Sequence, residues 1–425
     1  MHKFCYPQEQ PFIRSYQPII HAHKGQIKKA VQLFALAKRP VVFFGGGIVL
    51  ANAEEELRHW IQLTGVPCVS SLMGLGAYPA SHPQFLGMVG MHGTYEANMA
   101  MQQADVVLAL GVRFDDRVIS VPEKYLATAK KIIHIDVDPS SIAKRVPVDV
   151  PIVGDIKLAL QTMTHQWEEK QLILDHKGLQ CWWEGIEQWR GRKSLSYLDD
   201  ERIIKPQYVI ESLAQLTRNR AYIASDVGQH QMFVAQYYPF EKSRQWFNSG
   251  GLGTMGVGLP YAMGAQLALP QETIFCVTGD GSIQMNIQEL STCYQFKLPI
   301  KIINLNNQYL GMVRQWQEFY YEGRYSHTYM DSLPDFVKLA QAYGHVGMRI
   351  EKKADVLPAL KEAIALQDQL VFMDFITSQE QNVYPMVGNG KGLDEMLLPP
   401  HMRHSAQDSE VFDAKNKHYD TRSVP

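Results

Sequence analysis

Two apolar runs with polar endings constrain the fold of this chain most strongly. The run at residues 273–278 ends in Gly279-Asp280-Gly281, and the run at residues 299–305 ends in Asn306-Asn307. The segment between them has helical periodicity, so the three pieces read as strand, helix and strand. In such a unit the two strands are usually parallel neighbours. Both polar endings are therefore expected at one edge of a parallel sheet, where they can share a ligand.

The same alternation of short apolar runs and amphipathic segments fills two long regions, from residue 26 to about 163 and from 206 to about 378. This alternation predicts an α/β fold with two doubly wound parallel-sheet domains. The runs expected to be strands are VVFFGGG, PCVSSL, DVVLALG and KIIHIDVD in the first region, and AYIASDVG, QWFNSGG, TIFCVTGDG, PIKIINLNN and LVFMDFIT in the second.

These patterns divide the chain into five expected segments. They are an N-terminal lead-in (1–24), a central α/β domain (25–165), a connecting segment (166–204), a second α/β domain (205–385) and a C-terminal tail (386–425). Trp182, Trp183 and Trp189 recur at core-like helical spacings within the connecting segment. The end of the tail is polar with little periodicity, so we expect it to be partly disordered.

Composition excludes several classes of partner and site. Forty-one basic and forty-three acidic side chains leave a formal charge of −2, which gives no overall field for nucleic acid. The five cysteines have no CxxC or Cys/His spacing, so we expect neither a disulfide framework nor a zinc site, and a reducing cytoplasm fits them. The longest apolar patch, at residues 41–50, is about half of the ~20 residues that a membrane span needs. A soluble cytoplasmic protein is expected.

The polar strand endings suggest a metal-bound diphosphate. Asp280 lies between two glycines that let the backbone approach a ligand closely, and the helix expected directly after it offers N–H groups that favour a phosphate. Asp280 and Asn307 together can hold one cation, and oxygen-only ligands suggest Mg²⁺. The alternative is that the Gly-Asp-Gly stretch forms a turn and the Asn pair caps a helix, which suits either motif taken alone.

The spacing of the two motifs resembles a known signature. GDG, twenty-four intervening residues and NN form the pattern shared with thiamine-diphosphate enzymes. Longer motifs resemble the catalytic subunits of bacterial acetolactate synthases over roughly residues 25–395. These motifs are SDVGQHQMF, SGGLGTMGVGLPYAMGA, GDGSIQMNIQEL, NNQYLGMVRQWQ, SSLMGLGA, GMHGTYEANM and GVRFDDRV.

The resemblance assigns roles in the second domain residue by residue. Asp280 and Asn307 correspond to the Mg²⁺ ligands, and the backbone carbonyl of Tyr309 to a third protein ligand. Gln229 and His230 correspond to residues that hold the diphosphate. The other implied cofactor contacts are Gly253 through its carbonyl, Met255 as the apolar prop that bends the cofactor, Gly279, Gly281, Ser282 and Met285.

The same resemblance places Met312, Val313 and Trp316 in the substrate pocket, and predicts that Trp316 favours the larger of two acceptors. Without the family, a Met/Trp pair four residues apart is more often part of a core. A lone histidine such as His230 is likewise more often a surface or core residue than a ligand. The motifs around both residues favour the functional interpretation.

In the first domain, FFGGGIV alone is a weak dinucleotide-binding signal, and it suits a tight strand-to-helix turn equally well. The neighbouring motifs resemble the family's FAD site, where the flavin is structural and not the redox agent. Arg117 is also expected to face the carboxylate of the second substrate. The implied FAD contacts are Gly45, Gly47, Met91, His92, Gly111, Arg113, Asp115, Arg117 and Asp136.

The resemblance implies a transferase that decarboxylates pyruvate on thiamine diphosphate and joins the two-carbon unit to pyruvate or 2-oxobutyrate. These products lead to valine and isoleucine, among the branched-chain amino acids. A homo-oligomer and a regulatory small subunit are also implied. The family's chain normally begins with a further α/β domain that supplies a glutamate to the cofactor of another subunit, and no glutamate here matches it. We therefore expect little activity from this chain alone, and a partner chain that supplies that domain.

Two alternatives stay open at this point. The chain can be a non-catalytic protein that retains cofactor sites, or another thiamine-diphosphate lyase, carboligase or oxidase with a different acceptor. Intact Asp280, Asn307 and Trp316 favour catalysis over simple cofactor binding. The motif NNQYLGMVRQWQ disfavours a different acceptor.

Overall fold

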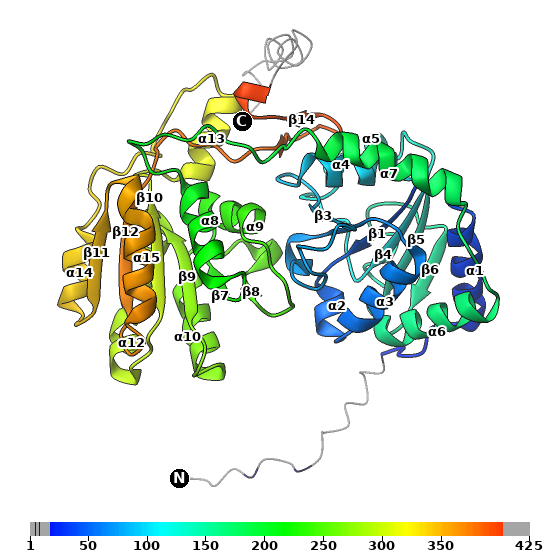
Figure 1. Cartoon of the computed structure of the whole chain (residues 1–425), viewed down its shortest axis with the longest axis horizontal. Helices are drawn as coiled ribbons and strands as arrows, with labels where there is room; N and C mark the ends of the chain where they lie inside the picture. Colours follow the sequence, from blue (N-terminus) through cyan, green and yellow to red (C-terminus); the bar gives the residue numbers. More distant parts are fainter. Residues whose placement is uncertain (1–4, 6–7, 9–17, 403–425) are drawn as a thin grey trace, which may run out of the picture.

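The computed structural model describes residue 5, residue 8 and residues 18–402, and it contains two six-stranded sheets that lie side by side (Figure 1). All strand pairs within these two sheets are parallel. The predicted fold class is therefore confirmed. Most of the tail that we expected to be disordered, residues 403–425, lies outside the described residues.

The first sheet has the strand order β3-β2-β1-β4-β5-β6. Its strands are β1 (Pro40–Phe44), β2 (Cys68–Ser70), β3 (Phe85–Met88), β4 (Val106–Leu110), β5 (Lys131–Asp136) and β6 (Val150–Val153). The helices around it are α1 (Lys24–Ala35), α2 (Gly46–Leu50), α3 (Glu54–Thr64), α4 (Tyr95–Gln103), α5 (Pro122–Tyr125), α6 (Ile156–Glu169) and α7 (His176–Arg190).

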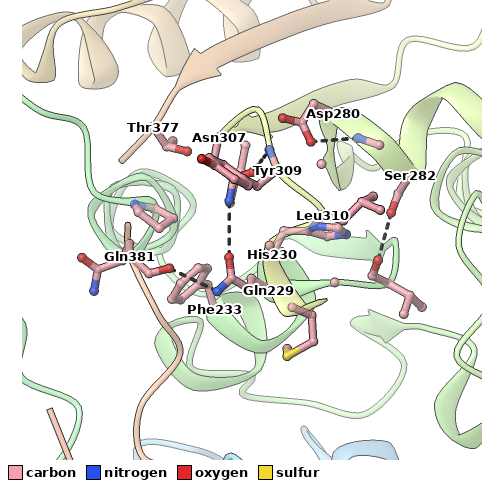
Figure 2. A pocket seen from close by; sticks show the side chains of 18 of the residues that line it. Gln229, His230, Phe233, Asp280, Ser282, Asn307, Tyr309, Leu310, Thr377 and Gln381 are labelled. Carbon is pink, nitrogen blue, oxygen red and sulfur yellow. Dashed lines mark hydrogen bonds between the residues drawn. The ribbon is translucent and has the colours of Figure 1, made fainter. Parts of the chain in front are cut away.

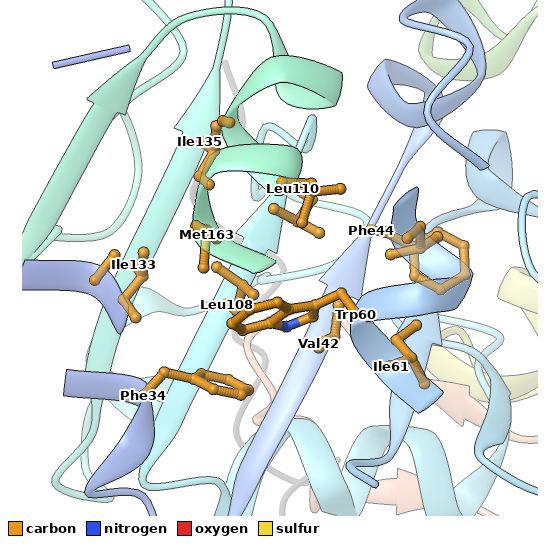
Figure 3. Close-up of a cluster of buried hydrophobic side chains, with 14 of the residues drawn as sticks. Phe34, Val42, Phe44, Trp60, Ile61, Leu108, Leu110, Ile133, Ile135 and Met163 are labelled. Carbon is orange, nitrogen blue, oxygen red and sulfur yellow. The ribbon is translucent and has the colours of Figure 1, made fainter. Parts of the chain in front are cut away.

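Both faces of this sheet are buried, which explains why its central strands are continuously apolar. Alternate residues of β1 point to opposite faces, so Val42 and Phe44 join one core and Val41 and Phe43 the other. In the first core, Figure 3 shows Trp60 of α3 among side chains of the sheet, and its ring lies 5.5 Å from that of Phe34. Burial of each such large side chain contributes about 1.5–3 kcal/mol to the free energy of folding.

The second sheet has the strand order β11-β12-β10-β9-β7-β8. Its strands are β7 (Tyr222–Ser225), β8 (Trp246–Phe247), β9 (Ile274–Gly279), β10 (Lys301–Asn306), β11 (Val346–Ile350) and β12 (Val371–Ile376). The helices are α8 (Pro206–Thr217), α9 (Gln229–Tyr237), α10 (Gly258–Ala268), α11 (Asp280–Ile283), α12 (Glu289–Phe296), α13 (Gly311–Tyr320), α14 (Phe336–Ala342) and α15 (Val356–Ala365).

Three strands that the sequence pattern did not predict all lie at sheet edges: β3, β6 and β11. Edge strands are covered less completely, so their sequences lack a long apolar run. Residues of β3 are alternately half-buried and buried, β6 contains Pro151, and four of the five residues of β11 are not fully buried. Proline is tolerated at such an edge because one side of the strand needs no partner.

The helix expected after Asp280 begins there, but it is not continuous. α11 ends at Ile283, a 3₁₀ turn follows at Gln284–Asn286, and α12 begins at Glu289. The turn carries Asn286, whose Nδ2 donates to the Gly256 carbonyl at 2.8 Å. This side-chain contact joins the interrupted helix to the loop before α10, and the sequence pattern gives no sign of it.

Two segments connect the sheets. α7 lies in the expected connecting segment and packs against the first sheet, where Trp182 is buried and its Nε1 donates to the Pro40 carbonyl at 3.0 Å. After β12 the chain returns to the first sheet (Figure 1), and the Val387 amide donates to the Met91 carbonyl at 2.7 Å. There β13 (Met386–Val387) and β14 (Met396–Leu397) form a small antiparallel sheet. Across the described residues, no helix combines the length and the apolar character that crossing a membrane requires.

Candidate active site

A cavity of about 110 Å³ lies at the carboxyl ends of β7, β9 and β10 and at the start of α13 (Figure 2). The chain leaves β7 toward β8 and returns on its other side as β9, so the cavity lies where the strand order reverses. Open α/β sheets bind ligands at such a point. The cavity is lined by Pro206, Val227, Gly228, Gln229, His230, Phe233, Met255, Gly279, Asp280, Gly281, Ser282, Leu305, Asn307, Tyr309, Leu310, Gly311, Met312, Val313, Thr377, Ser378 and Gln381.

Asp280 is the carboxylate of this cavity. It directly follows β9 and is almost fully buried. Its Oδ1 accepts from the Gly281 amide at 2.8 Å, and its Oδ2 accepts from the Gln308 amide at 2.6 Å. Burial nevertheless raises the pKa of Asp280 to about 7, because these hydrogen bonds only partly replace water. A buried carboxylate with no cationic side chain bonded to it is a strong candidate ligand for a metal cation.

Asn307 lies beside it at the end of the neighbouring strand. Its Oδ1 accepts from the Tyr309 amide at 3.0 Å, and its Nδ2 donates to Gln229 Oε1 at 3.3 Å. Figure 2 shows Gln229 between Asn307 and Gln381, whose carbonyl accepts from Gln229 Nε2 at 3.2 Å. The structure therefore brings together a carboxylate, an amide oxygen and the Tyr309 backbone, which are oxygen donors of the kind that Mg²⁺ prefers.

His230 supplies a buried polar atom without a partner. Its Nε2 has no hydrogen bond among the described residues, although its side chain is buried. Burial lowers the pKa of His230 to about 3, so the imidazole is neutral at pH 7. A Cβ built on Gly228 or Gly279 would lie within 3.0 Å of its ring. A buried polar atom without a partner in such a glycine-walled cradle is a candidate contact for a ligand.

Gly311 keeps the backbone of α13 close to the two amides. A Cβ built there would lie 2.1 Å from Gln229 Oε1 and 2.9 Å from Asn307 Nδ2. The opposite wall is similar, because a Cβ on Gly281 would lie 2.9 Å from a Leu310 methyl carbon. The close approach at these positions explains why glycine stands at each of them.

Three residues expected at this site lie outside the cavity wall. Gly253 is exposed, and a Cβ built on it would meet no heavy atom within 4 Å. Met285 is 54% exposed. Trp316 is half-buried on α13, with its ring 5.2 Å from that of Tyr320, whereas Met312 and Val313 of the same helix line the cavity. The assigned roles of Gly253, Met285 and Trp316 stay predictions.

The glycines expected at a flavin site lie where the first sheet reverses its strand order, at the carboxyl ends of β1 and β4. A Cβ on Gly45 would lie 2.7 Å from the Gly111 carbonyl oxygen, and a Cβ on Gly47 2.5 Å from the Gly111 Cα. These three glycines therefore pack against one another. Close helix–strand packing is one role of glycine in dinucleotide-binding turns, but a structural turn needs it equally.

The remaining residues of the expected flavin site occupy the same end of the first sheet. Asp136 ends β5, and burial raises the pKa of its carboxyl group. Arg113 pairs with Asp115 at 3.3 Å near the surface. Arg117 donates to the Met91 sulfur at 3.6 Å, and the Met91 amide donates to the Arg117 carbonyl at 2.8 Å.

His92 connects this edge of the first sheet to the C-terminal segment. Its Nδ1 contacts the Pro385 carbonyl at 3.1 Å, while its Nε2 has no partner among the described residues. Burial lowers the pKa of His92 to about 4, so the ring is neutral at pH 7. The Gln236 amide of α9 donates to the carbonyls of both His92 and Tyr384 at 3.0 Å. These contacts join the first sheet, the second sheet and the returning chain.

Two buried polar residues behind the cavity were not predicted. Asp226 is fully buried, and its carboxylate accepts from the Gly256 amide at 2.7 Å and from Thr278 Oγ1 at 3.1 Å. Its position at the end of an apolar run, as for Asp280, was the signal that marks it. Gln315 is also fully buried and bonds to Gln229. Its helical spacing from Met312 and Phe319 indicates an inward side chain but not its partner.

Comparison with known proteins gives two family matches and a set of relatives. Residues 27–163 match the central domain of thiamine pyrophosphate enzymes, and residues 226–375 match their C-terminal TPP-binding domain. The acetolactate synthase isozyme 3 large subunit of Escherichia coli (strain K12) is 53% identical over 92% of this chain and 68% of its own length. The acetolactate synthase large subunit of Haemophilus influenzae is 52% identical over 93% of this chain and 69% of its own length. The acetolactate synthase of Mycobacterium leprae is 43% identical over 93% of this chain and 63% of its own length.

Proposed function

Because this chain belongs to the acetolactate synthase large-subunit family of thiamine-diphosphate enzymes, we propose that its cavity binds the diphosphate of that cofactor through Mg²⁺ held by Asp280 and Asn307. The observation that carries the proposal is the pairing of these two side chains at the carboxyl ends of the adjacent strands β9 and β10. The chain is a thiamine-diphosphate-dependent catalytic subunit of branched-chain amino acid biosynthesis. It decarboxylates pyruvate and joins the two-carbon unit to pyruvate or 2-oxobutyrate.

The cavity fits such a cofactor in three respects. Asp280 is buried without a bonded cation, which a divalent ion would supply. His230 Nε2 lacks a partner, and a diphosphate oxygen would provide one. Gly279, Gly281 and Gly311 let His230, Leu310 and Gln229 lie close against the backbone of the cavity wall, where a larger residue would displace them. When bound, thiamine diphosphate supplies the electron sink for decarboxylation. The protein residues hold its diphosphate, and the apolar Met255, Met312 and Val313 surround the cavity and limit access of water.

We place a structural FAD at the carboxyl edge of the first sheet. The support is the reversal of strand order between β1 and β4, with Gly45 and Gly111 at that point and Asp136 at the end of β5. We place Arg117, at the same edge, where it can meet the carboxylate of the second substrate. By analogy with relatives called large subunits, we propose a homo-oligomer that binds a regulatory small subunit.

A substitution at Trp316 tests the proposed acceptor preference. It lies four residues beyond Met312, which lines the cavity, and we propose that its ring contacts the extra methyl group of 2-oxobutyrate. We expect Trp316→Leu to lower the preference for 2-oxobutyrate over pyruvate about 5- to 160-fold, because one methylene contact is worth about 1–3 kcal/mol. Total turnover should fall less than this ratio.

The measurement is the product ratio of an active assembly supplied with both acceptors. Tyr320→Leu is a suitable control, because it removes the aromatic partner of Trp316 on the same helix and keeps the Trp316 ring itself. A product ratio unchanged by Trp316→Leu would make Trp316 a packing residue only.

A further inference from the structure

Three side-chain amides form one hydrogen-bonded chain that begins at the cavity wall and ends behind it. Asn307 Nδ2 donates to Gln229 Oε1 at 3.3 Å, and Gln229 Nε2 donates to Gln315 Oε1 at 2.9 Å. Asn307 and Gln229 line the cavity, but Gln315 does not, and it is fully buried. The chain therefore runs from the ligand site to a residue that cannot touch a ligand itself.

The backbone of Val383 determines which way the Gln315 amide points. Its N–H donates to Gln315 Oε1 at 2.7 Å, and its carbonyl accepts from Gln315 Nε2 at 3.3 Å. A backbone N–H can only donate and a carbonyl can only accept. If the Gln315 amide were flipped, its NH₂ group would face the Val383 N–H, and its oxygen would face the Val383 carbonyl oxygen. Neither pair could form a hydrogen bond. Its oxygen must therefore lie toward Gln229.

The orientation of the Gln315 amide determines that of Gln229, which in turn contacts Asn307. Gln229 Nε2 faces two acceptors, Gln315 Oε1 and the Gln381 carbonyl, so Gln229 turns its oxygen toward Asn307. Asn307 must then present Nδ2 to Gln229. Its Oδ1 lies on the other side, where it accepts from the Tyr309 amide at 3.0 Å. An amide oxygen has a second lone pair that can bind a cation, whereas an amide nitrogen cannot coordinate Mg²⁺.

We propose that Gln315 is a positioning residue, which orients Gln229 and, through it, turns the oxygen of Asn307 toward the metal ion. This inference rests on the proposed Mg²⁺ and thiamine-diphosphate site. Without Gln315, Gln229 keeps only the Gln381 carbonyl as an acceptor, so its amide is held less firmly, and the Tyr309 amide is then the main group that orients Asn307. A less firmly held Asn307 would present its oxygen to the cation less consistently. Loss of such an outer partner typically weakens metal binding about 10- to 100-fold.

Gln315→Met tests the proposal, because methionine keeps the length and volume of the side chain but removes the amide. The readout is the dissociation constant of Mg²⁺ in the presence of thiamine diphosphate, measured by calorimetry on the full chain. We expect about 10- to 100-fold weaker Mg²⁺ binding. An unchanged Mg²⁺ affinity would overturn the proposal.

Gln245→Met is the matched control. Gln245 is also fully buried in the second domain, and its Oε1 accepts from the backbone amides of Glu241 and Lys242. Its Nε2 donates to the carbonyls of Asn219 and Ala221. This variant loses hydrogen bonds of the same kind but should keep the Mg²⁺ affinity of the wild type. If it weakened Mg²⁺ binding as much as Gln315→Met does, general destabilisation would explain both results and the proposal would be wrong.

A double-mutant cycle shows whether Gln315 acts through Gln229. The double variant Gln229→Met, Gln315→Met should bind Mg²⁺ no more weakly than Gln229→Met alone, because Gln315 has nothing left to orient. Additive losses would contradict this route. Gln315→Glu provides a second variant that keeps an acceptor for both Gln229 Nε2 and the Val383 amide, although it loses the donor to the Val383 carbonyl. It should stay within about tenfold of the wild type, and an affinity as low as that of Gln315→Met would count against the proposal.

The outcome for the wild-type chain separates this inference from the function on which it rests. If the wild type binds thiamine diphosphate with the same affinity with and without Mg²⁺, the proposed metal site itself is wrong. If the wild type shows Mg²⁺-dependent binding and Gln315→Met binds Mg²⁺ with the same affinity, only the role proposed for Gln315 is wrong.

Discussion

Asp280→Ala is expected to weaken Mg²⁺-dependent binding of thiamine diphosphate by at least about 100-fold. Asp280 is the only carboxylate that lines the described cavity, and its two oxygens are held in place by the amides of Gly281 and Gln308. Loss of an outer partner already costs metal sites about 10- to 100-fold, so loss of a direct ligand should cost at least as much. Calorimetric titration of thiamine diphosphate at saturating Mg²⁺ measures the effect.

The fold should survive this substitution. Burial raises the pKa of Asp280 to about 7, which means that its ionised form is costly to bury without a cation. Removing the carboxylate relieves this cost in the free protein, which offsets the loss of its hydrogen bonds to the Gly281 and Gln308 amides. Asp280→Asn is the natural control, since it keeps an acceptor oxygen and removes the charge, and it should bind the cofactor with intermediate affinity. If Asp280→Ala bound thiamine diphosphate as tightly as the wild type does, the assignment of Asp280 as a metal ligand would be wrong.

Gly311→Ala should also remove most cofactor binding, for a steric reason. The added methyl group would lie 2.1 Å from Gln229 Oε1, so the Gln229 side chain must leave its position between Gln315 and Gln381. Asn307 would lose its Gln229 partner at the same time. We expect at least about tenfold weaker binding of thiamine diphosphate with Mg²⁺, measured by the same titration.

Stability should change little in Gly311→Ala. Gly311 begins α13 and does not have a positive φ angle, so alanine suits its backbone and gains up to about 1 kcal/mol of helix propensity. This gain partly offsets overpacking of about 1–3 kcal/mol. Gly264→Ala in α10 is the control, because a Cβ there meets nothing within 4 Å. It should raise stability slightly and leave binding unchanged. Equal cofactor affinity in Gly311→Ala and Gly264→Ala would show that the close approach at Gly311 has no role in binding.

The parts of the fold that sequence patterns predict are those with the deepest burial. β1, β4, β9 and β10 are covered on both faces, so their sequences are mainly apolar, and the polar endings of β9 and β10 stand out. This is why Asp280 and Asn307 could be placed on neighbouring strands in advance. The edge strands β3, β6 and β11 carry no such run, because only part of each is buried.

The amide chain behind the site could not be predicted, for a different reason. It depends on which side chains and backbone groups meet in three dimensions: Gln229 at the start of α9, Gln315 in the middle of α13, and Val383 in the segment after β12. No periodicity relates positions 229, 315 and 383. A similar limit applies to Gly45, Gly47 and Gly111. The FFGGGIV motif with Gly45 and Gly47 suits a dinucleotide-binding turn, and the structure adds that Gly111 packs directly against both.

The position of the bound metal ion decides whether Asp280 and Asn307 are its ligands. Mn²⁺ can replace Mg²⁺ in oxygen-ligand sites and is visible by anomalous scattering, so a crystal of the chain with thiamine diphosphate and Mn²⁺ would locate it. We expect one anomalous peak at the carboxyl ends of β9 and β10, within about 2.0–2.3 Å of an Asp280 carboxylate oxygen, of Asn307 Oδ1 and of the Tyr309 carbonyl oxygen. If the metal of a bound cofactor lay away from Asp280, or if Asn307 turned its nitrogen toward the metal, the proposed metal site would be wrong.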